Sequence, residues 1–272
     1  MGKGKKKKDE DVINVKSYKK LLNFYKIIFE PSFKDVSKSN SVLLYECFSN
    51  MFKNTNIVSN EGITFEKISL DDNHIFASIC RTSDLDVLTE IRNSKGIEVD
   101  DIVLESYTYF YINFEEMGVS VIKTQKIPSP DEYIKSLIYN KSSINLSLEP
   151  FKKSDSEIKN MLINKVTLSF CDNSNDFVEL KHINSDDYEI SEFKIEAKLK
   201  KVKTNFISNL IEKYKNSTNI KKISVSSDTE EVDIIKSIFT KQVSIELTKD
   251  YKKDFSKIEE TLKYELFKIV KA

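Results

Sequence analysis

The stretch from residue 106 to residue 149 constrains the fold most, because several local signals follow one another in it. Residues 107–114 are dense in aromatic and β-branched side chains, which favour a pleated, half-buried strand. Residues 115–118 form a short polar break that ends in Gly118, a glycine able to take a positive φ. Residues 119–123 then alternate between apolar and polar side chains. This order predicts an antiparallel hairpin.

A helix start follows this hairpin. Ser129 suits the N-cap, Pro130 suits the first helical position, and Glu132 is placed to close a capping box. The apolar face of the helix consists of Ile134, Leu137 and Ile138. Residues 144–148 alternate as a third strand. Hairpin, capped helix and returning strand predict a compact α+β unit, which contains no catalytic grouping.

Similar patterns predict the other elements of the chain. Apolar residues at helical spacing predict helices over residues 18–29, 42–52 and 255–269, and a capping box at 154–157 opens a shorter one. Alternation predicts strands at 63–68, 75–80, 166–170, 193–199, 223–225 and 243–247. We therefore expect an α+β fold in which mostly antiparallel sheets of hairpins are flanked by helices and form two packed halves. The expected divisions are a disordered basic arm (1–11), a helical N-terminal segment (12–60), an α+β core half (61–190) and an α+β C-terminal half (191–272).

The charge balance limits what the protein can bind. Its 43 basic and 43 acidic residues give a formal net charge of +0, so the whole molecule is not a histone-like polycation, although a local basic surface is compatible with this balance. Arg81 and Arg92 are the only arginines, and all other basic residues are lysines. Lysines attract phosphates as point charges, whereas arginines read guanine edges with a bidentate fork.

Motifs for catalysis and for cofactors are missing from the sequence. None of the five glycines forms a dinucleotide-binding turn or a phosphate-binding loop. His74 and His182 are the only histidines, and the acidic run 171–187 lacks the central glycine of a calcium loop. No nucleophile-elbow sequence supports a Ser/His/Asp site, although such triads assemble across a fold. We expect no enzyme activity, no cofactor and no metal.

Cysteine usage and hydropathy indicate a cytoplasmic protein. Cys47, Cys80 and Cys171 are widely separated, which favours buried, reduced thiols over disulfides. No apolar run is long enough to span a membrane. The lysine-rich N-terminus lacks the apolar segment of a signal peptide.

Several segments carry a family resemblance. They are the hairpins FEKI…FASICRTSD and YTYFYI…VSVIKT, the helix start PSPDEYI, the strands LSLEPF and VTLSF, and the pair VDIIKSIF and VSIEL before a last helix. In this order of elements, between Ile63 and Lys271, the chain resembles the RexA-like phage exclusion family and related uncharacterised bacterial proteins. The resemblance implies a homodimeric DNA-binding protein of antiviral defence or prophage control. It also implies that a membrane effector encoded nearby acts with this chain, which would be the soluble member. No catalytic motif comes with the resemblance, and the near absence of arginine departs from what sequence-specific binding favours.

Lysines are the candidate DNA-binding residues. The main patch is Lys194, Lys198, Lys200, Lys201, Lys203, Lys221 and Lys222, and a second candidate is the run Lys5, Lys6, Lys7 and Lys8. Binding of a DNA backbone by such lysines would be non-specific and sensitive to salt. Two alternatives stay open. The lysines can form an ordinary solvated strand face, and the chain can be a sensor or interaction module that binds a protein without DNA.

The closing segment bears on assembly. Its apolar stripe consists of Phe255, Ile258, Leu262, Leu266 and Ile269. Such a stripe has to be buried against another surface. It packs either on the protein's own sheet or, together with the strand edge 242–247, in the twofold interface of a homodimer.

Overall fold

The computed structural model of the chain describes residues 15–30, 38–84, 107–171, 192–200, 220–234, 238–248 and 251–271, with residues 206, 209, 210 and 212. The strands are β1 (Lys16–Phe29), β2 (Ile57–Asn60), β3 (Ile63–Leu70), β4 (His74–Arg81), β5 (Thr108–Asn113), β6 (Gly118–Lys123), β7 (Leu146–Pro150), β8 (Lys165–Cys171), β9 (Glu192–Lys198), β10 (Ile220–Ser226), β11 (Glu230–Asp233) and β12 (Ile238–Leu247). The helices are α1 (Asn40–Met51), α4 (Pro130–Ser142), α5 (Asp155–Asn160) and α7 (Tyr251–Val270), with a 3-10 turn at Thr82–Asp84.

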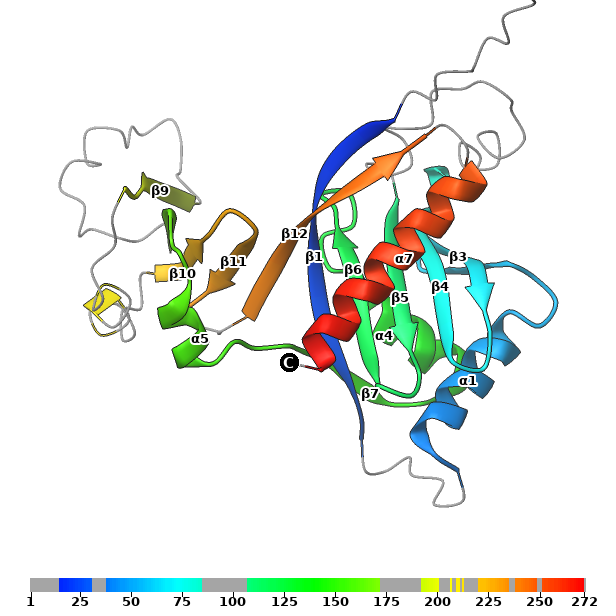
Figure 1. Cartoon of the computed structure of the whole chain (residues 1–272). Coiled ribbons are helices and arrows are strands. Elements are labelled where there is room, and N and C mark those ends of the chain that lie inside the picture. Colours follow the sequence, from blue (N-terminus) through cyan, green and yellow to red (C-terminus); the bar gives the residue numbers. More distant parts are fainter. Residues whose placement is uncertain are drawn as a thin grey trace, which may run out of the picture.

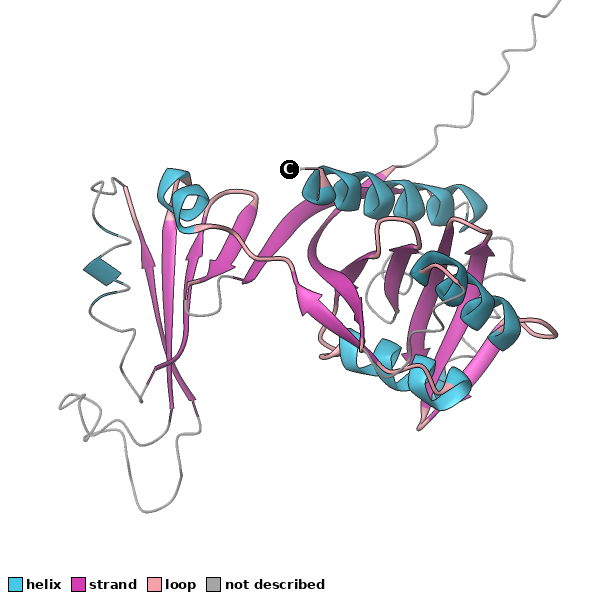
Figure 2. Ribbon diagram, turned by 90° about the horizontal axis from the view of Figure 1, so that it is seen from below, coloured by secondary structure: helices cyan, strands magenta, loops and turns pink. Residues whose placement is uncertain are grey.

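The protein has the expected α+β fold, with a large antiparallel sheet and flanking helices (Figure 1). The sheet has twelve strands in the order β2-β3-β4-β5-β6-β1-β12-β11-β10-β8-β9, and β7 pairs with β1. It bends where β1 and β12 meet, which gives two lobes. In the large lobe, α7 crosses one face of the sheet while α1 and α4 lie on the other face (Figure 2). The small lobe contains α5, β8 to β11 and the first residues of β12.

The two lobes do not follow the residue ranges that we expected for the two halves. Strand β8 lies within the range 61–190, yet it pairs with β9 and β10 of the range 191–272. Strand β12 pairs with β11 through residues 238–241 and with β1 through residues 240–247, so it belongs to both lobes. Strand pairing joins segments that are remote in sequence, and local patterns do not reveal it. The predicted arm at 1–11 lies outside the described residues.

The stretch 106–149 folds largely as predicted. Strands β5 and β6 pair as a hairpin, and α4 begins with Pro130 at its first turn and buries its predicted apolar face. The side chain of Ser129 makes no capping hydrogen bond, so the predicted capping box is absent at this helix. The third strand, β7, does not return beside the hairpin, because β1 lies between β7 and β6.

Gly118 serves a different purpose from the one predicted. The residue with a positive φ in this turn is Met117 (φ 51°), whereas Gly118 is the first residue of β6. A Cβ atom at Gly118 would lie 3.1 Å from Cδ1 of Leu266 on α7. The glycine at residue 118 therefore allows α7 to pack closely against β6, where a Cβ atom would have too little room.

The helix predicted over residues 18–29 is wrong, since these residues form β1. The helical segment expected at 12–60 therefore contains one helix, α1, between the strands β1 and β2. Strand β1 is central in the sheet, with β6 on one side and β12 and then β7 on the other. Its apolar side chains are buried on both faces, Leu22 and Phe24 in one cluster and Tyr25 and Ile27 in another. A strand buried on both faces loses the alternation that identifies strands, and its apolar run can imitate a helix.

The apolar stripe of α7 packs on the protein's own sheet. Ile258, Leu262 and Leu266 are fully buried there, and the Ser120 hydroxyl of β6 donates a hydrogen bond of 3.0 Å to the carbonyl oxygen of Leu262. The stripe is thus not available as an interface between two copies of the chain.

Candidate functional site

The small lobe has one polar sheet face that gathers lysines from three neighbouring strands. Lys194 of β9 is opposite Ser169 of β8, which is opposite Lys222 of β10. Residues opposite one another in an antiparallel ladder lie on the same face, so these three residues form a row across the sheet. Four residues further along the strands, Lys198 is directly opposite Lys165. We call Lys165, Lys194, Lys198 and Lys222 the lysine face.

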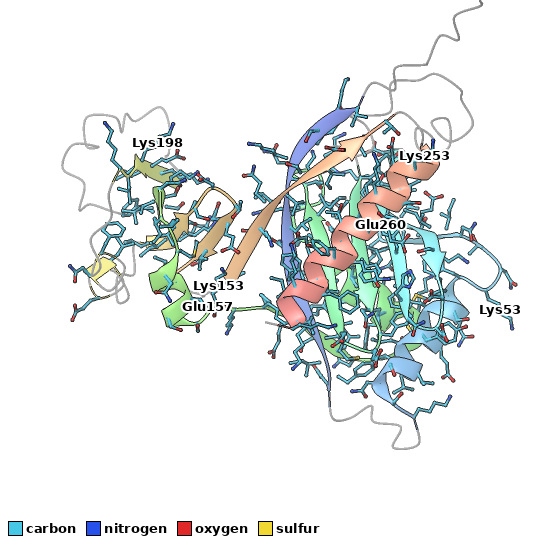
Figure 3. All side chains as sticks on the ribbon, in the orientation of Figure 1. Lys53, Lys153, Glu157, Lys198, Lys253 and Glu260 are labelled. Carbon is cyan, nitrogen blue, oxygen red and sulfur yellow. The ribbon has the colours of Figure 1, made fainter. Side chains whose placement is uncertain are left out.

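The other side of this sheet is apolar. Val166 and Phe170 of β8 alternate with the polar residues and belong to the same buried cluster as Ile223 and Val225 of β10. Ile158 of α5 joins that cluster. The apolar side is therefore the interior of the small lobe, and the lysine face is the opposite side of the sheet. Figure 3 shows Lys198 on the small lobe, far from α7.

The predicted lysines fall into three groups. Lys194, Lys198 and Lys222 are on the lysine face, and Lys165 joins them although its isolated place in the sequence gave no reason to select it. Two further predicted lysines are exposed but lie elsewhere: Lys200 is in the bend after β9 and Lys221 is at the irregularity of β10. The remaining predicted lysines lie outside the described residues, namely Lys5, Lys6, Lys7, Lys8, Lys201 and Lys203.

Lys222 and Lys165 of this face form ion pairs with acidic side chains. The Nζ atom of Lys222 lies 2.7 Å from Glu231 Oε1, and that of Lys165 lies 3.5 Å from Glu196 Oε2. Burial raises the pKa of the Glu231 carboxyl, but the hydrogen bond and the charge of Lys222 outweigh burial and leave that pKa below its usual value. Both ion pairs are partly exposed, and such pairs contribute about 0–1 kcal/mol. An incoming anion can therefore compete for these lysines at small cost.

A second polar cluster joins the β3–β4 turn to α7. His74 Nε2 lies 2.7 Å from Glu259 Oε1, and His74 Nδ1 lies 3.0 Å from Asp71 Oδ1. The Ser69 hydroxyl donates to the same Glu259 oxygen at 2.8 Å. The imidazole ring stacks on Tyr111, with 5.1 Å between the ring centroids.

This cluster has the members of a Ser/His/Asp triad but not the hydrogen-bond arrangement of one. Ser69 Oγ is 3.4 Å from His74 Nε2, whereas Glu259 Oε1 lies 2.7 Å from that nitrogen and also accepts the hydrogen bond of the Ser69 hydroxyl. A nucleophilic serine needs its proton to be taken by the imidazole. The backbone N–H groups of Asn73 and His74 both donate to Asp71 and are not available to an oxyanion. The cluster therefore acts as a structural link between the hairpin and α7.

The hydrogen bond from His74 to Glu259 raises the pKa of the histidine, and the charge of Asp71 adds to this against the opposing effects of burial and Lys263. For Glu259, burial acts to raise the pKa, but the hydrogen bonds from His74 and Ser69 lower it overall. Both shifts favour the charged forms of His74 and Glu259.

Other reactive groups are buried or isolated. Burial raises the pKa of the Cys47 thiol to about 11 and that of the Cys80 thiol to about 12, which agrees with the predicted buried, reduced cysteines at these two positions. The described part of the chain has no group of three or more His, Cys, Asp or Glu side chains arranged to hold a metal ion. Nor does it contain a helix with the length and apolar character needed to cross a membrane.

A groove of about 880 Å³ lies between β12 and α7. Its floor and rim include Lys241 and Val243 of β12, and its wall includes Lys257, Glu260 and Tyr264 of α7. Figure 3 shows Glu260 on this helix. Sequence reasoning selected the segment 242–247 as a strand edge but missed the groove, because α7 reaches it only through tertiary packing.

No protein-family model matches the chain, and no curated protein matches it.

Proposed function

We propose that the chain is a non-catalytic protein that binds a DNA backbone through the lysine face of its small lobe. The observation that carries this proposal is the cross-strand pair of Lys165 and Lys198. Like charges directly opposite one another destabilise a sheet. The ion pair of Lys165 with Glu196 already offsets part of this repulsion, and an anion between the two lysines would offset more of it. The arrangement therefore favours binding of a phosphate.

The spacing of the lysines fits a phosphate backbone. The row of Lys194 and Lys222 lies four residues along the strands from the row of Lys165 and Lys198. Four residues of an antiparallel strand span about 13 Å. Phosphates of one strand advance about 3.4 Å each along the axis of a duplex, so two rows about 13 Å apart can contact different phosphates of the same duplex.

The resemblance to RexA-like proteins supports a setting for this binding. In that setting the chain is the DNA-binding member of a phage exclusion or antiviral defence system and works with a membrane effector. The arrangement at His74, in which Glu259 accepts the hydrogen bond of the Ser69 hydroxyl, supports a protein without nucleophilic catalysis. The near absence of arginine supports binding without sequence preference.

The test is a titration of an unrelated DNA duplex at several salt concentrations. Neutralisation of four phosphates predicts a log–log slope of affinity against salt of about −3.6, since each phosphate contributes about −0.9. The double variant Lys194→Ala/Lys198→Ala should weaken binding to all sequences and make the slope about two units shallower. A matched control is Lys53→Ala/Lys141→Ala, which removes two exposed lysines of the large lobe and should leave the slope unchanged.

Three results would reject the proposal. The first is no DNA binding at low salt, and the second is a strong preference for one sequence. The third is an equal loss of affinity in the control and in the small-lobe variant, because the lysine face would then have no special part in binding.

A further inference from the structure

Strand β12 has an open edge in the part of the chain that the structure describes. Its residues 240 and 241 pair with β1 on one side and with β11 on the other. Residues 242–247 pair only with β1, because β11 begins at Glu230, after the turn at Thr229. Natural proteins protect such edges with charged side chains, especially lysine, or with proline. The sequence of this edge, QVSIEL, has no lysine or proline, and Glu246 is its one charged residue.

The peptide groups that face this edge follow from one hydrogen bond. The backbone N–H of Gln242 donates to the carbonyl oxygen of Thr229 at 2.6 Å, so residue 242 points towards the side where β11 lies. Peptide groups alternate sides along a strand. The N–H and C=O groups of Ser244 and Glu246 therefore face the open edge, while those of Ile245 face β1.

The wall of the groove beside this edge carries charges of both signs. Lys257 and Glu260 lie one helical turn apart on α7, and neither is in an ion pair within the described residues. Tyr264 stands on the same wall with 61% of its surface exposed. A surface that presents a lysine beside a glutamate is complementary to a second copy of itself, since a twofold axis brings each charge towards the opposite one.

We propose that a second copy of the chain docks on this edge, so that two β12 strands pair antiparallel about a twofold axis at Ile245. This register places Ser244 opposite Glu246 of the other copy, and Glu246 opposite its Ser244. The N–H and C=O groups of Ser244 and Glu246 then form hydrogen bonds with those of the other copy. An axis at Ser244 would instead place Glu246 opposite Gln242, whose N–H is already bonded to Thr229. The register about Ile245 avoids this conflict.

The pairing joins the two sheets into one and leaves the small lobes at opposite ends of the dimer. Six residues of edge bury little surface by themselves, and stable interfaces bury more than about 1,000 Å² in total. The α7 walls of the two copies supply the rest, with Tyr264 as the exposed aromatic side chain to be covered. The inference does not require DNA binding, since the lysine face plays no part in it.

The first test introduces a charge into the proposed interface and measures the oligomeric state by analytical ultracentrifugation. The unmodified protein should sediment as a dimer at tens of micromolar. Ser244→Glu places two glutamates opposite one another at both ends of the pairing and should give a monomer. Ser244 is exposed, so the fold should survive, and far-UV circular dichroism checks this.

Glu246→Lys alone places a lysine opposite Ser244 and should stay dimeric. The double variant Ser244→Glu/Glu246→Lys places opposite charges together and should restore the dimer. A monomeric unmodified protein overturns the proposal. So does a Ser244→Glu variant that stays dimeric, or a double variant that does not recover.

A second test does not depend on the stability of the charge variants. In the proposed register, residues 244 and 246 of the two copies are a hydrogen-bonded pair with Cα atoms about 5.5 Å apart, a distance that a disulfide can span. Ser244→Cys/Glu246→Cys should form a covalent dimer on mild oxidation. Ser244→Cys alone should not, because the two residues 244 are not opposite one another. Cross-linking of the single variant, or none in the double variant, contradicts the register.

Discussion

Replacement of Leu262 by alanine should destabilise the protein more than any exposed change on α7. Leu262 is fully buried between the helix and the sheet. The substitution removes three carbon groups, which forfeits about 2.4 kcal/mol of transfer free energy at about 0.8 kcal/mol for each group. The cavity left in a packed interior adds to this, and Leu→Ala changes in cores cost about 2–5 kcal/mol in total. We expect a loss of about 3–4 kcal/mol.

Urea denaturation followed by circular dichroism measures this loss. At about 2–4 °C for each kcal/mol in large domains, the thermal midpoint should fall by about 6–16 °C. The control is Lys263→Ala, the exposed neighbour on the same helix, which should change the stability by less than about 0.5 kcal/mol. Both variants should be compared at a low protein concentration, so that assembly contributes nothing.

The reasoning is refuted if Leu262→Ala lowers the free energy of unfolding by less than about 1 kcal/mol, because the loss of three carbon groups from a packed core destabilises by more than that. Leu262→Asp is a more severe form of the same test. A buried, unpaired carboxylate should prevent folding. A soluble, folded monomer of Leu262→Asp would instead mean that the α7 stripe is an interface between copies.

Two further predictions concern contacts of α7. The raised pKa of His74 means that its ion pair with Glu259 contributes stability that is fully present below pH 6.5, the usual histidine value, and is lost as the pH rises through the higher folded-state pKa. The difference in thermal midpoint between the unmodified protein and His74→Gln should therefore shrink from pH 5.5 to pH 9, and a constant or growing difference would contradict the assignment. Gly118→Ala should cost about 1–3 kcal/mol, because its Cβ would lie 3.1 Å from Leu266 Cδ1. Ser244→Ala, at an exposed position, is its control in the same denaturation assay, and equal stabilities would show that the helix shifts freely.

Local sequence signals by themselves determined much of the fold. The capping box of Ser154 and Glu157 forms at α5, and Pro130 opens α4, since each depends only on residues within one helical turn. The turn between β3 and β4 is equally local, with Asp71 accepting backbone hydrogen bonds from Asn73 and His74. The stripe of α7 is found at its predicted place because a long amphipathic period is a strong signal.

The sequence also determined that any anion site would consist of lysines. It selected Lys194, Lys198 and Lys222, which the lysine face includes, but it could not add Lys165. That residue becomes the direct neighbour of Lys198 only through the register of β8 and β9. Cross-strand neighbours depend on pairing between segments that are remote in sequence. The sequence of one strand does not predict which residues of another strand lie opposite it.

Only the tertiary structure decided the role of residues 16–29 and the contacts of α7. Strand β1 has the apolar spacing of a helix, and its pairing with β6, β7 and β12 overrides that local preference. The ion pair of His74 and Glu259 joins residues 185 positions apart. Among the described residues, the edge of β12 is open because β11 begins at Glu230, after the turn, while β12 continues beside β1. Each of these features depends on which segments lie side by side, and packing of the whole chain sets that arrangement.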